Sequence, residues 1–153
     1  MFDTIAGLPI HPLAVHAVVV LLPVMALLTV AVAVRASWRP YARWVLVGNL
    51  GVLVAAVGAR QSGLKLYSRV SQFGTPSDLV ETHASYGKVM PLFALLLVVA
   101  AAVVVASVSR PSVVPVAVVV AVVAGLAGIG ATVVTGDSGA RAVWSDTIKN
   151  TRG

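Results

Sequence analysis

The sequence predicts an all-α integral membrane protein, a four-helix bundle with signs of an internal two-helix duplication. Hydrophobic residues make up 59% of the 153 residues and charged residues only 10%, whereas a soluble domain carries about 25% charged residues. Four segments are long and apolar enough to cross a bilayer. The chain has no cysteine, which excludes disulfides, iron–sulfur clusters and covalent c-type haem. A surface this poor in charge also excludes a soluble enzyme.

The expected spans follow from the need for about 20 mostly apolar residues in a transmembrane helix. They are residues 13–34, 44–59, 89–108 and 113–135, within a single domain of residues 1–153. Between them, residues 60–88 are expected to form an external loop with a short interfacial helix, and residues 136–153 an interfacial tail. The link between the last two spans is so short that these spans must form an antiparallel hairpin.

Basic residues decide the expected orientation. Residues 1–12 contain no Lys or Arg, whereas the first connection carries Arg35, Arg39 and Arg43. Cytoplasmic connections of membrane proteins are enriched in basic residues, so we expect this connection inside and both termini outside the plasma membrane. The net charge of +6 is then explained by span ends near anionic lipid head groups, and no nucleic acid partner is expected.

The residues able to do chemistry gather at one end of the predicted bundle. This end is opposite to the three closely spaced arginines, at the N-terminal ends of the first and third spans. The residues concerned are His11, His16, Tyr67, Asp78, Glu81, His83, Tyr86 and Asp137. A protein that only filled the membrane would not need this asymmetry, so we place any site at this end.

The histidines of the first and third spans are the leading candidates. His11 and His16 are five residues apart, roughly 140° around a helix, so they do not share a face. His16 is expected about one turn inside the bilayer, where an ionisable residue is a functional candidate by default, and we therefore take it as the inward-facing one. His83 lies on one helix face with Gly87 and Met90.

The two halves of the sequence resemble each other weakly. Each half contains, in order, a histidine, a proline, two spans, the pattern Ser-Gly-x-basic, and an aromatic residue followed by serine. The Ser-Gly pairs that follow the second span of each half, Ser62-Gly63 and Ser138-Gly139, are called the exits below. Both halves cross the membrane in the same direction, which implies a pseudo-twofold axis along the membrane normal. On this reading His16 and His83 are equivalent and face each other across the axis.

Several of these segments resemble the DUF2231 family of small predicted membrane proteins. The run from Gly7 to His16 (GLPIHPLAVH), His83 with Gly87, and the exit from Thr135 to Arg141 carry the resemblance. It implies a four-span fold along the whole chain and singles out His11, His16 and His83. It implies no activity.

Three functions stay open at this stage. The first is a b-type haem protein for membrane electron transfer, with His16 and His83 as axial ligands and Met90 in reserve. Arg60 is a candidate partner for the haem propionates, together with Lys65, Arg69 or Lys88. A membrane electron-transfer partner or a homodimer would fit this function.

The second function is a divalent-metal protein, in which His11, His16, His83 and Asp137 would hold Zn or Cu. The third is a non-catalytic membrane subunit or scaffold, whose histidines only cap helices and bond to the backbone. The sequence contains no nucleophile–base pair and no phosphate-binding loop, so an enzyme with bond chemistry of its own is not expected.

Overall fold

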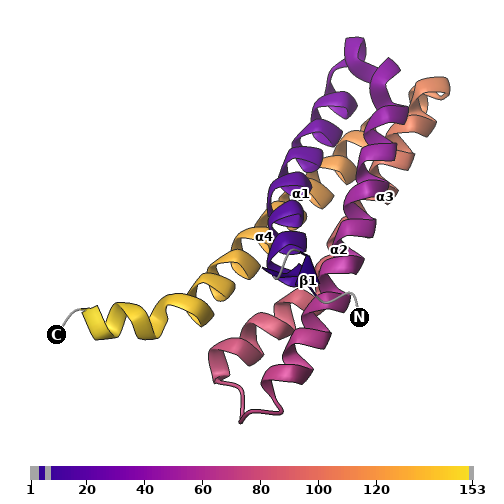
Figure 1. The fold of residues 1–153 in the computed structure, drawn as a ribbon. Coiled ribbons are helices and arrows are strands. Elements are labelled where there is room, and N and C mark those ends of the chain that lie inside the picture. The colour runs from indigo at the N-terminus through magenta and orange to yellow at the C-terminus, as the bar shows by residue number, and fades with distance from the viewer. Residues whose placement is uncertain (1–3, 6–7, 152–153) are drawn as a thin grey trace.

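The chain folds as a bundle of four long antiparallel helices, as predicted (Figure 1). The computed structural model describes residues 4–5 and 8–151. The helices are α1 (Ile10–Val34), α2 (Ala42–Val70), α3 (Asp78–Ser109) and α4 (Val114–Thr151), with short 3-10 helices η1 (Ala36–Tyr41) and η2 (Pro111–Val113). Strands β1 (Thr4–Ile5) and β2 (Leu8–Pro9) form a small antiparallel pair. All four long helices are apolar enough to span a membrane.

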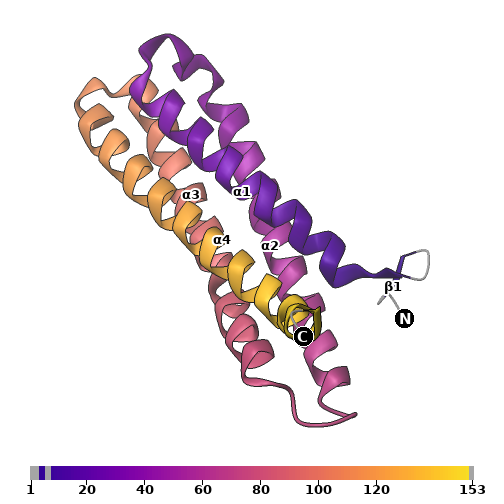
Figure 2. The ribbon, with the colours of Figure 1, turned by 90° about the vertical axis from the view of Figure 1, so that its left-hand side faces the viewer.

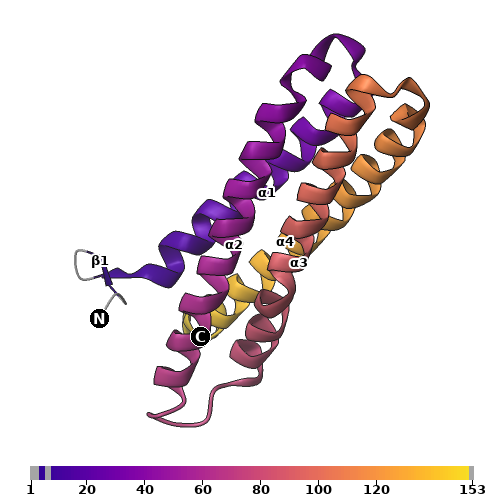
Figure 3. The same cartoon turned by 90° about the vertical axis from the view of Figure 1, so that its right-hand side faces the viewer.

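The helices form a ring in which each packs mainly against two others. α1 contacts α2 and α4, α3 contacts the same two helices, and α1 and α3 approach each other across the middle. Figures 2 and 3 show η1 and η2 at one end of the bundle and the α2–α3 connection at the other. β1 and the start of α1 lie toward the same end as the α2–α3 connection, and the last turns of α4 project away from the bundle there (Figure 1).

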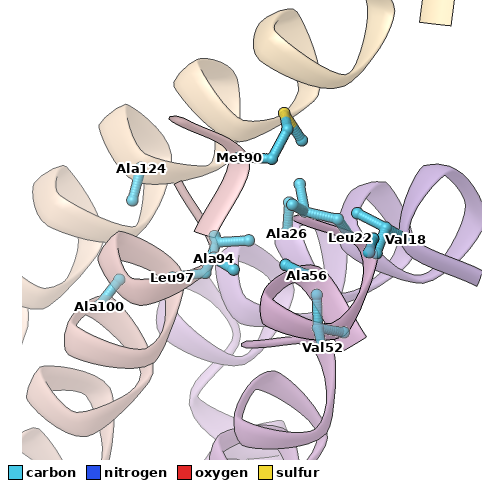
Figure 4. Packing of buried hydrophobic residues seen from close by; sticks show 11 residues of the cluster. Val18, Leu22, Ala26, Val52, Ala56, Met90, Ala94, Leu97, Ala100 and Ala124 are labelled. Atoms are coloured by element: carbon cyan, nitrogen blue, oxygen red, sulfur yellow. The ribbon is translucent and has the colours of Figure 1, made fainter. Parts of the chain in front are cut away.

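Small residues allow the helices to approach closely in the core (Figure 4). Leu22 and Leu97 are fully buried, and a Cβ on Gly128 would lie 3.0 Å from the Cδ2 atom of Leu22. Close approach at small residues is how membrane helices gain contact where lipid supplies no hydrophobic driving force. Large apolar side chains such as Leu27 and Val54 point outward, as expected of a surface that faces acyl chains.

The helices extend well beyond the predicted spans and occupy most of residues 60–88, the segment expected to lie outside the membrane. α2 continues to Val70 and α3 begins at Asp78, which leaves only residues 71–77 as the connection. Gly74 lies in this connection with a φ of 154°, a conformation that favours glycine. The expected tail also continues α4 to Thr151, and residues 152–153 lie outside the described residues.

Burial repeats along the two halves of the chain. The buried residues Val18, Leu22, Thr29 and Val32 of α1 have buried counterparts Met90, Ala94, Ala101 and Val104 in α3, at one constant sequence offset. The buried residues Val45, Asn49, Val52, Ala56 and Ala59 of α2 correspond in the same way to Ala121, Gly125, Gly128, Thr132 and Thr135 of α4. The two hairpins therefore bury equivalent faces, which supports the predicted duplication.

Candidate histidine site

A cavity of about 360 Å³ lies among the four helices at the end that holds the α2–α3 connection. Most of its walls are apolar, formed by valine, alanine, leucine and glycine. The ionisable side chains that line it are His11, Arg60, Tyr67, His83 and Lys88. Its size is in the range of small-molecule sites, which are mostly apolar with a few placed polar groups.

His11 enters this cavity from the first turn of α1 and is fixed by α2. Its Nδ1 atom lies 3.1 Å from the carbonyl oxygen of Ala59 and 3.3 Å from the hydroxyl oxygen of Ser62. Ser62 in turn donates to the same carbonyl at 3.0 Å. Two groups of the neighbouring helix therefore hold one ring nitrogen of His11.

His83 is fixed by α4 through the same contacts. Its Nδ1 atom lies 3.2 Å from the carbonyl oxygen of Thr135 and 3.1 Å from the hydroxyl oxygen of Ser138. Ser138 donates to the Thr135 carbonyl at 2.8 Å. The two histidines thus occupy equivalent positions in the two hairpins.

These contacts determine the tautomer of both rings. A carbonyl oxygen only accepts hydrogen bonds, so each Nδ1 must carry the proton and donate it. In a neutral imidazole this tautomer leaves the lone pair on Nε2, and neither Nε2 has a hydrogen-bond partner in the described part of the chain. The ring centroids of His11 and His83 are 6.4 Å apart, with an interplanar angle of 66°.

Two glycines make room for the rings. A Cβ on Gly63 would lie 2.8 Å from the Cε1 atom of His11, and a Cβ on Gly139 would lie 2.9 Å from the Cε1 atom of His83. Either contact is shorter than real Cβ atoms show. The Ser-Gly pair therefore contacts its histidine in the same way in both halves. The serine forms a hydrogen bond with the imidazole, and the glycine, which has no side chain, leaves space for the ring.

The structure corrects the pairing of histidines. His11, not His16, is the equivalent of His83, and its separation from the serine it contacts is 51 residues, close to the 55 residues between His83 and Ser138. His16 is exposed and bonds through Nδ1 to the carbonyl oxygen of Pro12 at 2.6 Å. It does not line the cavity, because the five-residue separation turns it away from the face that carries His11.

The other predicted site residues lie at different places. Met90 lines the cavity and is 6% exposed, and its sulfur accepts a hydrogen bond from the Thr135 hydroxyl at 3.3 Å. Arg60 borders the cavity. Asp137 is exposed and accepts a hydrogen bond from Nε of Arg141 at 2.8 Å.

The ligand set expected for Zn or Cu is not brought together. His11 and His83 are adjacent, but His16 faces outward and Asp137 is bonded to a residue of its own helix. Across the described part of the chain, no group of three or more potential metal-ligating His, Cys, Asp or Glu residues is found. What the structure assembles instead is a pair of imidazoles.

The family comparison agrees with the fold. The family model described as "Predicted membrane protein (DUF2231)" matches residues 7–152. It covers both histidines of the pair and both Ser-Gly exits; Gly7, the first matched residue, lies outside the described residues. No curated protein and no solved structure matches the chain.

Proposed function

The chain belongs to the DUF2231 family of predicted membrane proteins, and from this premise we propose that it binds a b-type haem between His11 and His83 and transfers electrons in the membrane. The observation that carries the proposal is the pair of imidazoles whose Nδ1–H groups are both bonded to backbone carbonyls. Metal-ligating histidines almost always donate the other ring N–H in this way, which fixes the ring and raises its basicity. A histidine that merely capped a helix would not need an equivalent partner facing it.

The two rings lie close enough to hold one group between them. Their centroids are 6.4 Å apart, and neither Nε2 atom has a hydrogen-bond partner in the described part of the chain. His11 and His83 would together hold a haem iron, and the haem would supply reversible one-electron transfer.

The surroundings of the pair favour a flat apolar group over a bare ion. The cavity walls are apolar, and within the described residues no third His, Cys, Asp or Glu joins the pair. Zn²⁺ in proteins takes four ligands in structural sites and three protein ligands in catalytic ones. A haem would need only the two imidazoles of His11 and His83 from the protein.

The presence of two imidazole ligands also limits the kind of reaction that a bound haem could support. A haem held by both His11 and His83 would supply electron transfer rather than bond chemistry. The absence of a nucleophile–base pair in the sequence is consistent with this function.

The test is an absorbance spectrum of the full chain, expressed with a haem precursor and purified in detergent. We expect a Soret band and, after reduction, the sharp visible bands of a low-spin haem. His11→Ala and His83→Ala should each abolish the band or weaken haem binding at least tenfold, because each removes one axial bond. Metal analysis of the same samples should find iron in a one-to-one ratio.

His16→Ala is the matched control, because His16 belongs to the same helix but faces outward. It should leave the spectrum unchanged. The proposal is wrong if the purified protein takes up no haem on reconstitution, or if bound haem survives both His11→Ala and His83→Ala. Stoichiometric Zn or Cu without a Soret band would support the divalent-metal alternative.

A further inference from the structure

Arg60 and Lys88 are the cations among the described residues that line the cavity. Arg60 of α2 and Lys88 of α3 both line it and both are exposed at its rim. Within the part of the chain that the structure describes, neither forms an ion pair with a carboxylate. Both lie just outside the apolar stretches expected as spans, residues 44–59 and 89–108, where a long cationic side chain can reach the polar edge of the bilayer. Two such side chains beside one apolar cavity indicate an anionic ligand.

The cations occupy only one side of the cavity. Arg60 and Lys88 come from α2 and α3, which are neighbours in the ring. Among the lining residues, the opposite wall from α1 and α4 carries no Lys or Arg; it is mostly apolar, with Val15, Val19 and Val143, and it also holds His11, Thr132 and Thr135. The cavity is therefore amphipathic, with a cationic rim facing a mostly apolar wall.

This polarity breaks the pseudo-twofold symmetry of the histidine pair. By the offsets that relate the two hairpins, Gly136 corresponds to Arg60 and His16 corresponds to Lys88. Neither Gly136 nor His16 lines the cavity. A symmetric pair of imidazoles alone would accept a planar ligand in either of two directions. The asymmetric rim supplies what the histidines lack, a preference for one direction.

We infer that the cavity binds its ligand in one orientation, with two carboxylates at Arg60 and Lys88 and the apolar edge toward α1 and α4. This rests on the proposed function, since a haem b carries two propionates on one edge and apolar substituents on the other. Arginine offers a planar fork and lysine a point charge, and each forms strong charge-assisted hydrogen bonds with a carboxylate.

The test compares haem with haem dimethyl ester, in which the carboxylates are neutral, on the full chain purified from haem-deficient cells. We expect the unmodified protein to bind haem at least tenfold more tightly than the ester, because two charge-assisted bonds are lost. The double variant Arg60→Gln/Lys88→Gln should keep the Soret band of low-spin haem and bind both porphyrins with similar affinity. Arg43→Gln, an exposed cation at the other end of the bundle, should keep the tenfold preference.

The outcomes separate this inference from the proposed function. If the unmodified protein binds both porphyrins equally, or the double variant retains the preference, the haem site stands and the assignment of Arg60 and Lys88 is overturned. If neither porphyrin gives a Soret band, the proposed function and this inference both fall. A double variant that keeps the Soret position but loses the preference supports both.

Discussion

Gly63 and Gly139 give the sharpest test at the scale of single residues. A Cβ at either position would lie under 3.0 Å from a histidine Cε1 atom, and that ring is held by two contacts to the neighbouring helix. The ring cannot move aside without losing them. We expect Gly63→Ala or Gly139→Ala to destabilise the protein by about 1 to 3 kcal/mol and to weaken haem binding in a spectral titration.

Gly51→Ala provides the matched control for this prediction. Gly51 lies on the same helix as Gly63, and a Cβ added there would meet no atom within 4 Å. Its spectrum and stability should equal those of the unmodified protein. Equal haem affinity in all three variants would show that the close approach of the Ser-Gly exits to the rings has no role in binding.

The choice between His11 and His16 shows where reasoning from sequence reached its limit. The spacing correctly predicted that the two histidines do not share a face. Depth in the bilayer then favoured His16, but the face turned inward is the one that carries His11, Val18 and Leu22. In a span that is apolar all round, nothing in the sequence marks the inward face, because lipid and protein interior both accept valine and leucine.

At the scale of helices, one buried polar contact joins α1 to α2. The amide nitrogen of Asn49 donates to the hydroxyl of Thr29 at 3.0 Å and to the carbonyl of Val45 at 2.9 Å, and both side chains are fully buried. Thr29→Val keeps the shape but leaves one amide proton of Asn49 without its acceptor. We expect a loss of about 1 kcal/mol in the free energy of unfolding, measured in detergent or bicelles.

Ser107→Ala is the comparison for this helix contact. Ser107 is also buried, but its hydroxyl bonds to Val104 of the same helix. Its removal should cost less than Thr29→Val, because no partner on another helix is left unsatisfied. A larger cost for Ser107→Ala would mean that the Asn49–Thr29 bond does not stabilise the first hairpin.

The extent of the helices was less predictable than their number. Hydropathy identified the four spans, but it ends where charged residues begin, at Arg60 and before Lys88. The helices continue because no strong breaker occurs before residues 71–77, where Gly74 and Pro76 lie. These extra turns position Tyr67 and His83 at the cavity. An analysis restricted to the predicted spans would therefore miss both residues.

At the scale of the whole molecule, the duplicated hairpins supply the pair of histidines, and the two cations make the cavity asymmetric. The two hairpins repeat the histidine, the carbonyl, the serine and the glycine, which sets two equivalent imidazoles across the bundle. The Ser-Gly pairs indicated the repeat from the sequence alone. That His11, and not His16, corresponds to His83 follows only from the constant offset between the buried residues of the two hairpins. The cationic rim of Arg60 and Lys88 belongs to α2 and α3 alone, and it gives the repeated scaffold a direction.

If the site transfers electrons as proposed, the orientation of the bundle in the membrane determines the compartment with which it exchanges them. η1 contains Arg39 and is preceded by Arg35, its N-cap, at the end opposite the histidine pair. Basic connections stay in the cytoplasm. We therefore expect the histidine site on the external face.

Alkaline phosphatase fused after Gly153 should be active, and a fluorescent protein that folds only in the cytoplasm should be dark at the same position. A fusion truncated within η1 should give the reverse pair of signals. If the fusion after Gly153 fluoresces, the expected orientation is wrong and the histidine site faces the cytoplasm.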